Sequence, residues 1–565
     1  MRQNFSAVLA ARAAHSGPEV LTAGPWHITL DAAPASVHRQ EGLTAVLKGQ
    51  LYDLDLADLL RLYRQHGPNF PRFFDGSFSL LILDEALGTV LAVTDRMGSH
   101  KLYAAHDGER VTLSTLPDHP DFVRRPYHPA ALASLLTSGA VLNDLSLYQG
   151  VQSLTAAHLH DIRPGGIRSQ PYWQLLPPEG LDTRAEPELR EECAELLQRA
   201  VRRRVERLRG PVHLSLSGGY DSRGLLSLLA ATGREVRTFS YYQGTRRADG
   251  DATVADALAA QYGARHEHVQ AYGGDLLATL RRNAIWGHGM TKFCDEVDAW
   301  QTLAAQNVSD VFVGDVVHAV HHLPLPDMAE QFARWEISPF ASLGKLATAF
   351  APTACRALET AWTAEIDQMS DGIARYGNPR QQEYLLRSQQ RVTHVLLPWR
   401  ERFTGHAAAV HMPYLDGAIL EFIHRLPPTM LAGKRLVNGA LQRLDSDIYR
   451  VPLARSSGYV TDWHSELIRH REAIREELLC GSSQLDELIE PQAIEAVLDS
   501  LSAQESVRSR RMAQVRRTLG TIRRSRAGQK ILGRARVKHQ RVSPAIWLLR
   551  VLTLRVADLE RQRRS

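Results

Sequence analysis

The alternation of short strand-like segments with helical segments between residues 212 and 269 constrains the fold of this chain most strongly. Three runs, Val212–Leu216, Val236–Tyr241 and His266–Val269, have the length of strands. The helical stretches Ser222–Ala231 and Asp251–Tyr262 lie between them. Strands that alternate with helices at this spacing predict an α/β fold with a doubly wound parallel sheet, whose ligands bind beyond the carboxyl ends of the strands.

The rest of the chain divides around this region. Residues 1–178 contain many short strand-like runs and predict a β-rich first domain, and the prolines and glycine of residues 175–180 indicate a linker. We expect the second domain to span residues 186–507 and to be mostly helical after about residue 325. Residues 508–565 form an Arg-rich helical tail in which 18 Lys and Arg residues face two acidic ones.

The strongest chemical signal is the loop Ser217-Gly218-Gly219-Tyr220-Asp221-Ser222, which follows a predicted strand and opens a helix. Its glycines let successive amide groups face a polyphosphate at the positive end of the helix, and Ser217 and Ser222 add hydroxyl donors. Asp221 would repel a phosphate unless a Mg²⁺ ion lies between them. The loop therefore predicts a site for a nucleotide with Mg²⁺.

Residues at the ends of neighbouring strands extend this predicted site. Asp315 follows the apolar run Val311–Val313 and could bring a second carboxylate to the metal, so we expect Asp221 and Asp315 to be metal ligands and to act in catalysis. The other expected nucleotide contacts are Leu216, Ser217, Gly218, Gly219, Ser222, Ser240, Tyr241 and Gly314. Nearby His318, His321 and His322 have no further ligand to complete a zinc site, and we interpret them as polar loop residues.

The loop resembles the pyrophosphate-binding SGGxDS loop of the ATP pyrophosphatase superfamily, whose members adenylate a carboxyl or carbonyl oxygen. Phe74–Leu80 and Thr94–Tyr103 resemble the glutamine amidotransferase domain of the asparagine synthetase-like family. His411–Asp416 resembles a block in the second domain of that family. The resemblance implies an Ntn-type αββα amidotransferase-like first domain and a parallel-sheet ATP pyrophosphatase second domain, with ATP and Mg²⁺ as cofactors.

Two departures from the family bear on the reaction. Glutamine-hydrolysing members begin with a catalytic cysteine after the initiator Met, whereas this sequence has Arg2 there and no cysteine before Cys193. We therefore expect no glutaminase activity by that mechanism. The segment Arg455–Tyr459 resembles a family region that contains a lysine, but the lysine is missing. Arg455 could supply its charge in catalysis, or the alignment of this segment could differ.

Similar proteins without the cysteine take the amine from the same molecule, as in β-lactam synthetases and lasso-peptide cyclases. We favour a lasso cyclase, which would adenylate an Asp or Glu side chain of a leader-free core peptide. Attack by the N-terminal amine of the peptide would form an isopeptide (macrolactam) bond and release AMP and pyrophosphate. The expected partners are the precursor or core peptide, the leader peptidase and the precursor-recognition protein of the same pathway.

Other functions remain open on the sequence. The alternatives are a β-lactam synthetase-like ligase for small molecules, an asparagine synthetase-like enzyme that takes free ammonia, and an inactive peptide-binding scaffold. The general base is unassigned. Glu383-Tyr384 resembles the Tyr/Glu pairing of the β-lactam branch, but we interpret it as a helical surface pair.

The location and the tail give weaker expectations. No run approaches 18 consecutive apolar residues and the four cysteines have no metal-binding spacing, so we expect a cytoplasmic protein with no membrane partner. The tail could be a basic amphipathic helix for nucleic acid or anionic lipid, or a docking surface for an acidic partner. We favour helices packed on the second domain with a solvated Arg face, and no nucleic-acid partner, because aromatic residues for base stacking are scarce.

Overall fold

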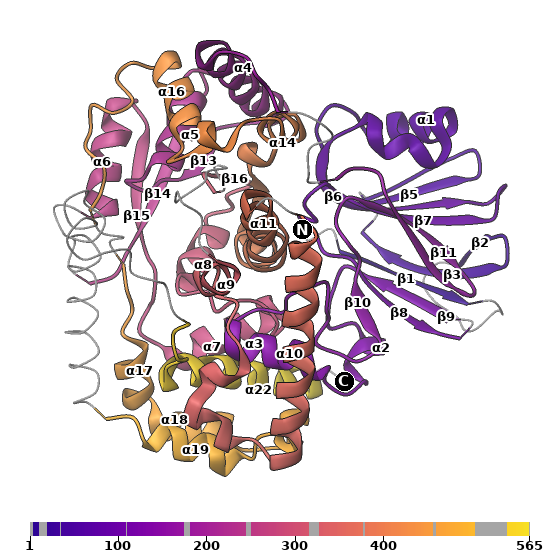
Figure 1. The fold of residues 1–565 in the computed structure, drawn as a ribbon, viewed down its shortest axis with the longest axis vertical. Helices are drawn as coiled ribbons and strands as arrows, with labels where there is room; N and C mark the ends of the chain where they lie inside the picture. The colour runs from indigo at the N-terminus through magenta and orange to yellow at the C-terminus, as the bar shows by residue number, and fades with distance from the viewer. Residues whose placement is uncertain are drawn as a thin grey trace.

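The computed structural model describes residues 4–10, 20–33, 36–108, 110–174, 181–244, 250–315, 327–376, 379–455, 459–502 and 539–563. Figure 1 shows a β-rich N-terminal part on the right and a larger α/β part on the left. The predicted fold class is confirmed. An antiparallel first domain is followed by a parallel sheet and a mainly helical C-terminal half.

The first domain consists of two six-stranded sheets that pack face to face. The first sheet has the order β10-β8-β9-β1-β3-β2 and contains β1 Phe5–Ala10, β2 Val20–Ala23, β3 Trp26–Ala32, β8 Tyr103–Asp107, β9 Arg110–Ser114 and β10 Val151–Ser153. The second has the order β12-β11-β7-β6-β5-β4 and contains β4 Val37–Gln40, β5 Leu43–Leu51, β6 Gly76–Asp84, β7 Thr89–Thr94, β11 His158–Arg163 and β12 Gly166–Pro171.

Alternation along the strands explains this sandwich. In β1, Phe5, Ala7 and Leu9 are buried while their neighbours are partly exposed, so one face points into the core between the sheets. Helix α1 (Leu56–His66) covers the outer face of the second sheet with Leu59 and Leu60. The remaining elements of this domain are η2 Gly67–Phe73, α2 Pro120–Val123 and α3 Pro129–Ser138.

The parallel sheet of the second domain has the order β15-β14-β13-β16-β17. Its strands are β13 Val212–Ser215, β14 Val236–Tyr242, β15 Arg265–Gln270, β16 Asp310–Val313 and β17 Ala409–His411, and all pairs are parallel. The chain passes from β13 outward to β15 and returns with β16 on the other side of β13. This reversal of strand order lies at the carboxyl end of β13, where open α/β sheets bind their ligands.

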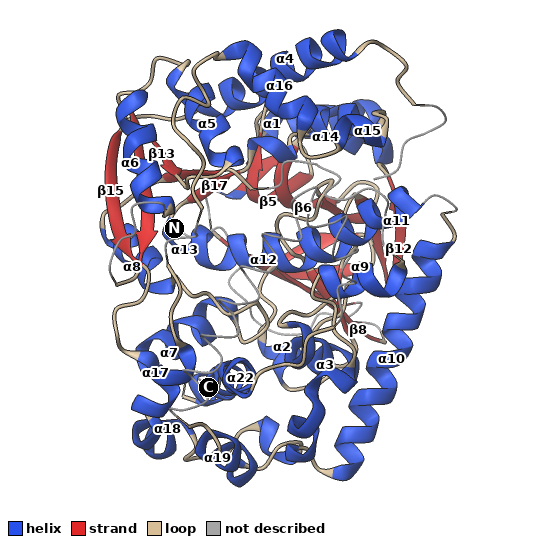
Figure 2. Ribbon diagram, turned by 60° about the vertical axis from the view of Figure 1, so that its left-hand side comes forward, coloured by secondary structure: helices blue, strands red, loops and turns tan. Residues whose placement is uncertain are grey.

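Helices cover the sheet and form the C-terminal half, as Figure 2 shows. Those around the sheet are α4 Glu186–Val205, α5 Tyr220–Ala230, α6 Asp251–Gln261, α7 Leu276–Gly287 and α8 Val297–Ala305. Those that follow β16 are α9 Met328–Arg334, η3 Phe340–Ala349, α10 Pro352–Ala374, α11 Pro379–Leu385, η4 Leu386–Leu396, α12 Leu397–Trp399, η5 Arg400–Thr404, α13 Gly405–Ala407, η6 Pro413–Leu415, α14 Gly417–His424, α15 Pro428–Leu431, α16 Arg435–Leu444, α17 Trp463–Arg469, α18 Arg471–Leu478, η7 Gln484–Glu487 and α19 Pro491–Asp499.

Helix α22 (Pro544–Gln562) joins the two halves of the molecule. It packs against α7 and α19 of the second domain and against α3 of the first, and its Trp547 and Leu552 are fully buried. The Arg550 guanidinium donates to the carbonyl oxygens of Leu136 and Thr137 at the end of α3. In its described part, the predicted tail therefore packs into the core, but the expected solvated Arg face is wrong for Arg555, which is fully buried. Among the described helices, none combines the length and the apolar character that crossing a membrane requires.

Candidate functional site

The predicted phosphate loop connects the end of β13 to the start of α5 and is held by its own hydroxyl groups. The Ser217 amide donates to Ser222 Oγ at 3.0 Å, and the two hydroxyl oxygens lie 2.9 Å apart. The Gly219 amide approaches Ser217 Oγ at 3.3 Å. These contacts fold the loop over the N-terminus of α5, which carries the positive end of the helix dipole.

Two glycines allow other segments to approach this loop closely. A Cβ atom on Gly218 would lie 2.4 Å from Ala454 Cβ and 2.9 Å from Val254 Cβ. One on Gly314, at the end of β16, would lie 2.5 Å from the backbone nitrogen of Ser222. The residue that follows β16 therefore packs directly on the backbone of the first turn of α5, which places Gly314 and the following Asp315 beside the loop.

Both predicted metal-binding carboxylates form ion pairs with basic side chains. Lys434 Nζ donates to the two carboxylate oxygens of Asp221 at 2.6 and 2.7 Å. Arg400 Nε donates to Asp315 Oδ2 at 2.5 Å. The Tyr414 hydroxyl donates to the Asp221 carbonyl oxygen at 2.9 Å and fixes the backbone at this position. The site thus alternates carboxylates with cations at the mouth of a helix N-terminus, which suits a polyanion with a divalent cation.

The remaining predicted nucleotide contacts lie in different places. Leu216 is buried in the core, and its amide donates to the Phe239 carbonyl oxygen. The Tyr241 ring packs on Tyr459 at 5.4 Å between ring centroids. Ser240 is buried, and its hydroxyl contacts His266 and His268. Arg455 is exposed, next to Ala454, whose amide donates to the Gly218 carbonyl oxygen.

A pocket of about 440 Å³ opens beside Asp221 and Lys434. Its other lining residues are Lys292, Phe293, Asp295, Glu296, Trp335, Arg387, Arg391, Val392, Val395, Leu396 and Trp399. Phe293, Trp335 and Trp399 give it aromatic walls, while the arginines give it positive charge. This size and mixture are typical of a small-molecule or peptide side-chain site.

Glu296 is a buried acid that lines this pocket. It is 7% exposed, and burial raises its pKa to about 7, assisted by the neighbouring Asp295 carboxylate and opposed by the charge of Arg400. Burial also raises the pKa of the Tyr459 hydroxyl, which hydrogen-bonds to Glu296. A carboxyl group that titrates near neutral pH beside a nucleotide-type loop can accept a proton during the reaction.

The family models agree with this architecture. The model described as "Asparagine synthase" matches residues 192–522, and the "Glutamine amidotransferase domain" model matches residues 53–173. The chain belongs to the asparagine synthase family. The predicted resemblance is therefore confirmed at the level of the family, and the asparagine synthase match contains the phosphate loop, Asp315, Glu296 and Lys434.

One curated relative matches part of this chain. A protein of Methanocaldococcus jannaschii named "Putative asparagine synthetase (glutamine-hydrolyzing) 2" is 26% identical over 182 residues. The match covers 31% of this chain and 35% of the relative, so the chain spans about a third of the length of that relative.

Two solved structures also match this chain. The glutamine phosphoribosylpyrophosphate amidotransferase of B. subtilis, complexed with ADP and GMP, is 10% identical with a TM-score of 0.21, and the match covers 47% of this chain and 85% of that one. A structure titled as the allosteric regulatory enzyme of purine biosynthesis is 11% identical with a TM-score of 0.21, and covers 47% and 75%.

ATP with Mg²⁺, which the asparagine synthase family implies, fits the residues present. Mg²⁺ takes one or two protein carboxylates together with phosphate oxygens, and Asp221 and Asp315 supply two carboxylates from adjacent strand ends. Lys434 and Arg400 form ion pairs with those carboxylates and add positive charge beside them. Asp251, at the start of α6, accepts a hydrogen bond from the Gly218 amide at 3.0 Å and so takes one of the loop amides that a phosphate could use.

The domain interface contains a second pocket of about 710 Å³. It lies between the amidotransferase-like domain and the synthetase part, and its lining includes Gly76, Asp95 and Arg96 of the first domain. Within it Lys48 forms an ion pair with Glu401 of η5, and both side chains are buried. Burial raises the pKa of Glu401, but the charges of Arg402 and Lys48 more than reverse this effect and hold it well below its usual value.

Four functional side chains of this site escaped the sequence predictions: Lys434, Arg400, Asp251 and Glu296. One signal was available for Lys434, because the chain has only seven lysines among its 67 basic residues. Lysine is therefore an uncommon choice here, and Lys292 and Lys434 both line the pocket. Asp251 opens a predicted helix, but its contact with the loop depends on tertiary packing.

One interpretation is wrong. Glu383-Tyr384 is no surface pair, because Glu383 is only 5% exposed and the Tyr384 hydroxyl lies 3.0 Å from His424 Nε2. Burial raises the pKa of Glu383. Helix α11 therefore directs the Glu383 side chain inward. The predicted loop histidines His318, His321 and His322 lie outside the described residues.

Proposed function

We propose that this chain is an ATP-dependent, AMP-forming amide ligase of the lasso-cyclase type. It would adenylate an Asp or Glu side-chain carboxylate of a leader-free core peptide and join it to the N-terminal amine of the same peptide. The observation that carries this proposal is the pocket beside Asp221 and Lys434, which combines nucleotide-binding charge with apolar and aromatic walls. Such walls suit a peptide segment better than a lone, highly polar amino acid.

Different residues would bind the phosphates, hold the metal ion and stabilise the reacting acyl group. The loop amides and the α5 N-terminus would hold the phosphates, and Mg²⁺ bound at Asp221 and Asp315 would neutralise charge on the departing pyrophosphate. Lys434, which lies on Asp221, would move its charge onto the phosphates and the reacting acyl group as they arrive. The carboxylate needs this activation because AMP leaves far more easily than an oxide ion.

The amine must lose a proton as it attacks the acyl-adenylate. Glu296 is the best-placed acceptor, since it lines the same pocket and its pKa of about 7 leaves much of it ionised at neutral pH. The aromatic walls would exclude water, which otherwise hydrolyses the adenylate. Binding the amine against the acyl carbon then supplies much of the rate.

The state of the amidotransferase-like domain supports an amine from the substrate rather than from glutamine. Among its described residues the interface pocket contains no cysteine, and the buried Lys48–Glu401 ion pair occupies part of it. A thiol nucleophile is what glutamine hydrolysis in this family requires. We infer that this domain serves as a scaffold for the synthetase site.

The test is nucleotide turnover with product identification. The full-length protein is incubated with Mg-ATP and synthetic leader-free peptides that place Asp or Glu at several distances from the N-terminus. We expect AMP, pyrophosphate and a peptide lighter by one water, about 18 Da. ADP in place of AMP would refute adenylation.

Parallel reactions test the other functions. Asparagine formed from aspartate and ammonia, with no cyclised peptide, would establish an ammonia-using synthetase instead. Turnover with only a small amino acid would favour the β-lactam type. Asp221→Ala, with its fold checked by circular dichroism, is the control that must abolish AMP release.

A further inference from the structure

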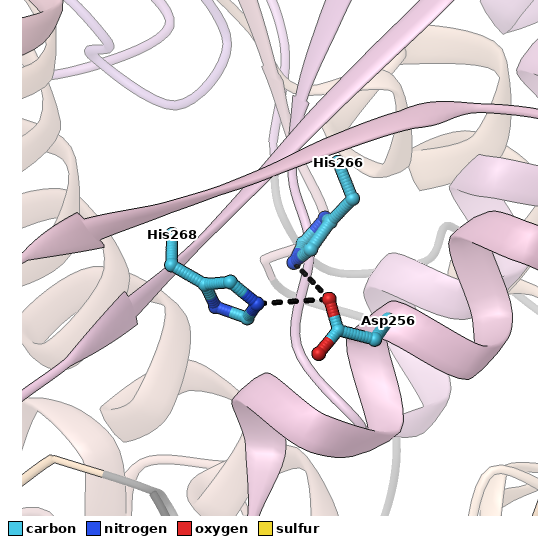
Figure 3. Close-up of side chains that lie close together, drawn as sticks. All are labelled: Asp256, His266 and His268. Carbon is cyan, nitrogen blue, oxygen red and sulfur yellow. Dashed lines mark hydrogen bonds and ion pairs between the residues drawn. The ribbon is translucent and has the colours of Figure 1, made fainter. Parts of the chain in front are cut away.

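A cluster of two histidines and one aspartate lies on the sheet edge away from the proposed nucleotide pocket. His266 and His268 occupy alternate positions on the edge strand β15 and therefore face the same side of the sheet. Helix α6 crosses this side and brings Asp256 over them. Figure 3 shows both imidazole rings directed at the Asp256 carboxylate, and we call these three residues the His–Asp cluster.

The distances within the His–Asp cluster suit a small ion with short bonds. Asp256 Oδ1 lies 2.8 Å from His268 Nε2 and 3.9 Å from His266 Nε2. Two ligands bonded at about 2.1 Å to a tetrahedral ion are about 3.4 Å apart, and the two measured distances bracket this value. Each of the three residues offers one ligand atom, and these three atoms all lie within 4.8 Å of one another. Little movement is therefore needed to bring them onto one ion.

Hydroxyl groups on the neighbouring strand β14 orient both rings. His266 Nδ1 lies 2.7 Å from Thr238 Oγ1, and His268 Nδ1 lies 3.3 Å from Ser240 Oγ. Metal-binding histidines use their second nitrogen in this way, which fixes the tautomer and the ring direction. The side chains of His266 and His268 are 6% and 16% exposed, whereas that of Asp256 is 47% exposed and leaves an entry path from solvent.

The hydrogen bonds around the two rings are compatible with a cation at this point. When Thr238 Oγ1 and Ser240 Oγ accept the Nδ1 protons of His266 and His268, both Nε2 atoms are unprotonated and can serve as metal ligands. His268 Nε2 then faces an Asp256 carboxylate oxygen at 2.8 Å, and a cation bound to both atoms stabilises this tautomer. In the other tautomer, a proton on His268 Nε2 makes a hydrogen bond to Asp256.

We propose that the His–Asp cluster binds one divalent transition-metal ion of the zinc class, with water completing four-coordination. Two imidazoles and one carboxylate form a typical zinc ligand set, whereas Mg²⁺ prefers oxygen ligands alone. The site is therefore chemically separate from the predicted Mg²⁺ site at Asp221 and Asp315. On metal binding the Ser240 hydroxyl turns away from His266 Nε2, which becomes a ligand.

The position of the cluster gives the ion a structural role. It ties α6 to the edge of the sheet, and the first turn of α6 contacts the phosphate loop through Asp251 and Val254. An ion that holds α6 in place would also hold Asp251 and Val254 against Gly218 of the phosphate loop. This proposal does not depend on the reaction proposed above, because it concerns metal content and stability alone.

The test measures zinc binding by the chelator-stripped full-length protein. Zn²⁺ is titrated in competition with a chromophoric chelator, and elemental analysis after dialysis gives the stoichiometry. We expect one ion per chain, and at least tenfold weaker binding in His268→Gln and Asp256→Asn. Ser240→Ala should weaken binding about tenfold through loss of ring orientation. The matched control is His213→Gln on β13, which lies two strands away from β15 in the sheet and should bind like the wild type.

A second readout separates metal binding from simple misfolding. Circular dichroism must show that the stripped variants keep the wild-type fold. Zn²⁺ should then raise the Tm of the wild type and of His213→Gln but not that of His268→Gln, and should slow amide exchange in α6. Less than one retained zinc per chain in the wild type, or equal affinity in His268→Gln, would overturn the proposal. The hydrogen-bond chain then runs the other way, with a proton on His268 Nε2 that binds Asp256.

Discussion

At the scale of single residues, the ion pair of Lys434 with Asp221 is the feature that most directly tests the site. Both side chains are only about one-fifth exposed, so the lysine is held where phosphates and the acyl group would lie. Lys434→Ala should lower AMP release by about 10² to 10³, the usual effect of removing a group that stabilises transition-state charge. The free energy of unfolding should change by less than about 1 kcal/mol, because partly exposed ion pairs contribute little.

The control for this variant is Lys345→Ala, an exposed lysine on η3. It should leave both AMP release and the unfolding curve unchanged. Wild-type turnover in Lys434→Ala would remove the lysine from the mechanism and return that role to Arg455.

Glu296 makes a prediction about pH. Its carboxyl group must be ionised to accept a proton, so kcat/KM should rise as the pH passes through about 7. Its folded pKa is raised above the unfolded value of 4.5, so its contribution to stability is fully present below pH 4.5 and is lost as the pH rises through about 7. Between pH 5 and pH 8 this loss amounts to about 2 to 3 kcal/mol.

Glu296→Gln should therefore remove the rise in activity near pH 7 and flatten the stability profile over the same range. Urea unfolding at pH 5 and pH 8, together with a pH–rate profile of the wild type and the variant, measures both effects. An unchanged pH–rate profile in Glu296→Gln would show that another group accepts the proton.

At the scale of elements, the contact between β16 and the phosphate loop depends on Gly314. A Cβ atom there would lie 2.5 to 2.8 Å from backbone atoms of Asp221 and Ser222, which cannot move aside as a flexible side chain can. Gly314→Ala should cost about 1 to 3 kcal/mol of stability through overpacking and should weaken ATP binding. Thermal unfolding and ATP titration measure these changes.

The matched glycine is Gly372 in α10, where a Cβ atom meets nothing within 4 Å. Gly372→Ala should stabilise the protein by about 0.4 to 1 kcal/mol and leave ATP binding unchanged. Equal effects of the two substitutions would show that the β16–loop contact is not as tight as described.

The same elements show what the sequence could predict. Local pattern is enough for β13, α5, β14, α6 and β15, because strand runs, glycine turns and helical periodicity lie within about sixty residues, and the structure places each within a few residues of its expected bounds. Lys434 reaches Asp221 across 213 residues, and Glu401 reaches Lys48 across 353. Such pairings depend on how the elements pack, so no local pattern indicates them. Glu383 was misassigned for the same reason, since its burial comes from distant parts of the chain.

At the scale of the whole molecule, the scaffold role of the first domain rests on buried contacts across the interface. Glu401 is 3% and Lys48 9% exposed, so removing one partner leaves the other charge buried without its main counter-charge. Glu401→Ala should destabilise the protein by about 3 to 5 kcal/mol. The double variant Lys48→Met with Glu401→Met should recover the part of this loss that comes from the unpaired Lys48 charge, whereas the buried Arg402 still lacks Glu401 as a counter-charge.

The number of unfolding transitions tests whether the two domains unfold together. Interface ion pairs, and the buried hydrogen bond from the Tyr127 hydroxyl to Asp558 of α22, join the first domain to the second on two sides. Calorimetry of the wild type should therefore show one cooperative transition. Glu401→Ala should lower the Tm of that single peak rather than split it, because α22 still couples the domains. Two separate peaks in the wild type would contradict the scaffold interpretation, since a domain that unfolds on its own cannot be what holds the synthetase site in shape.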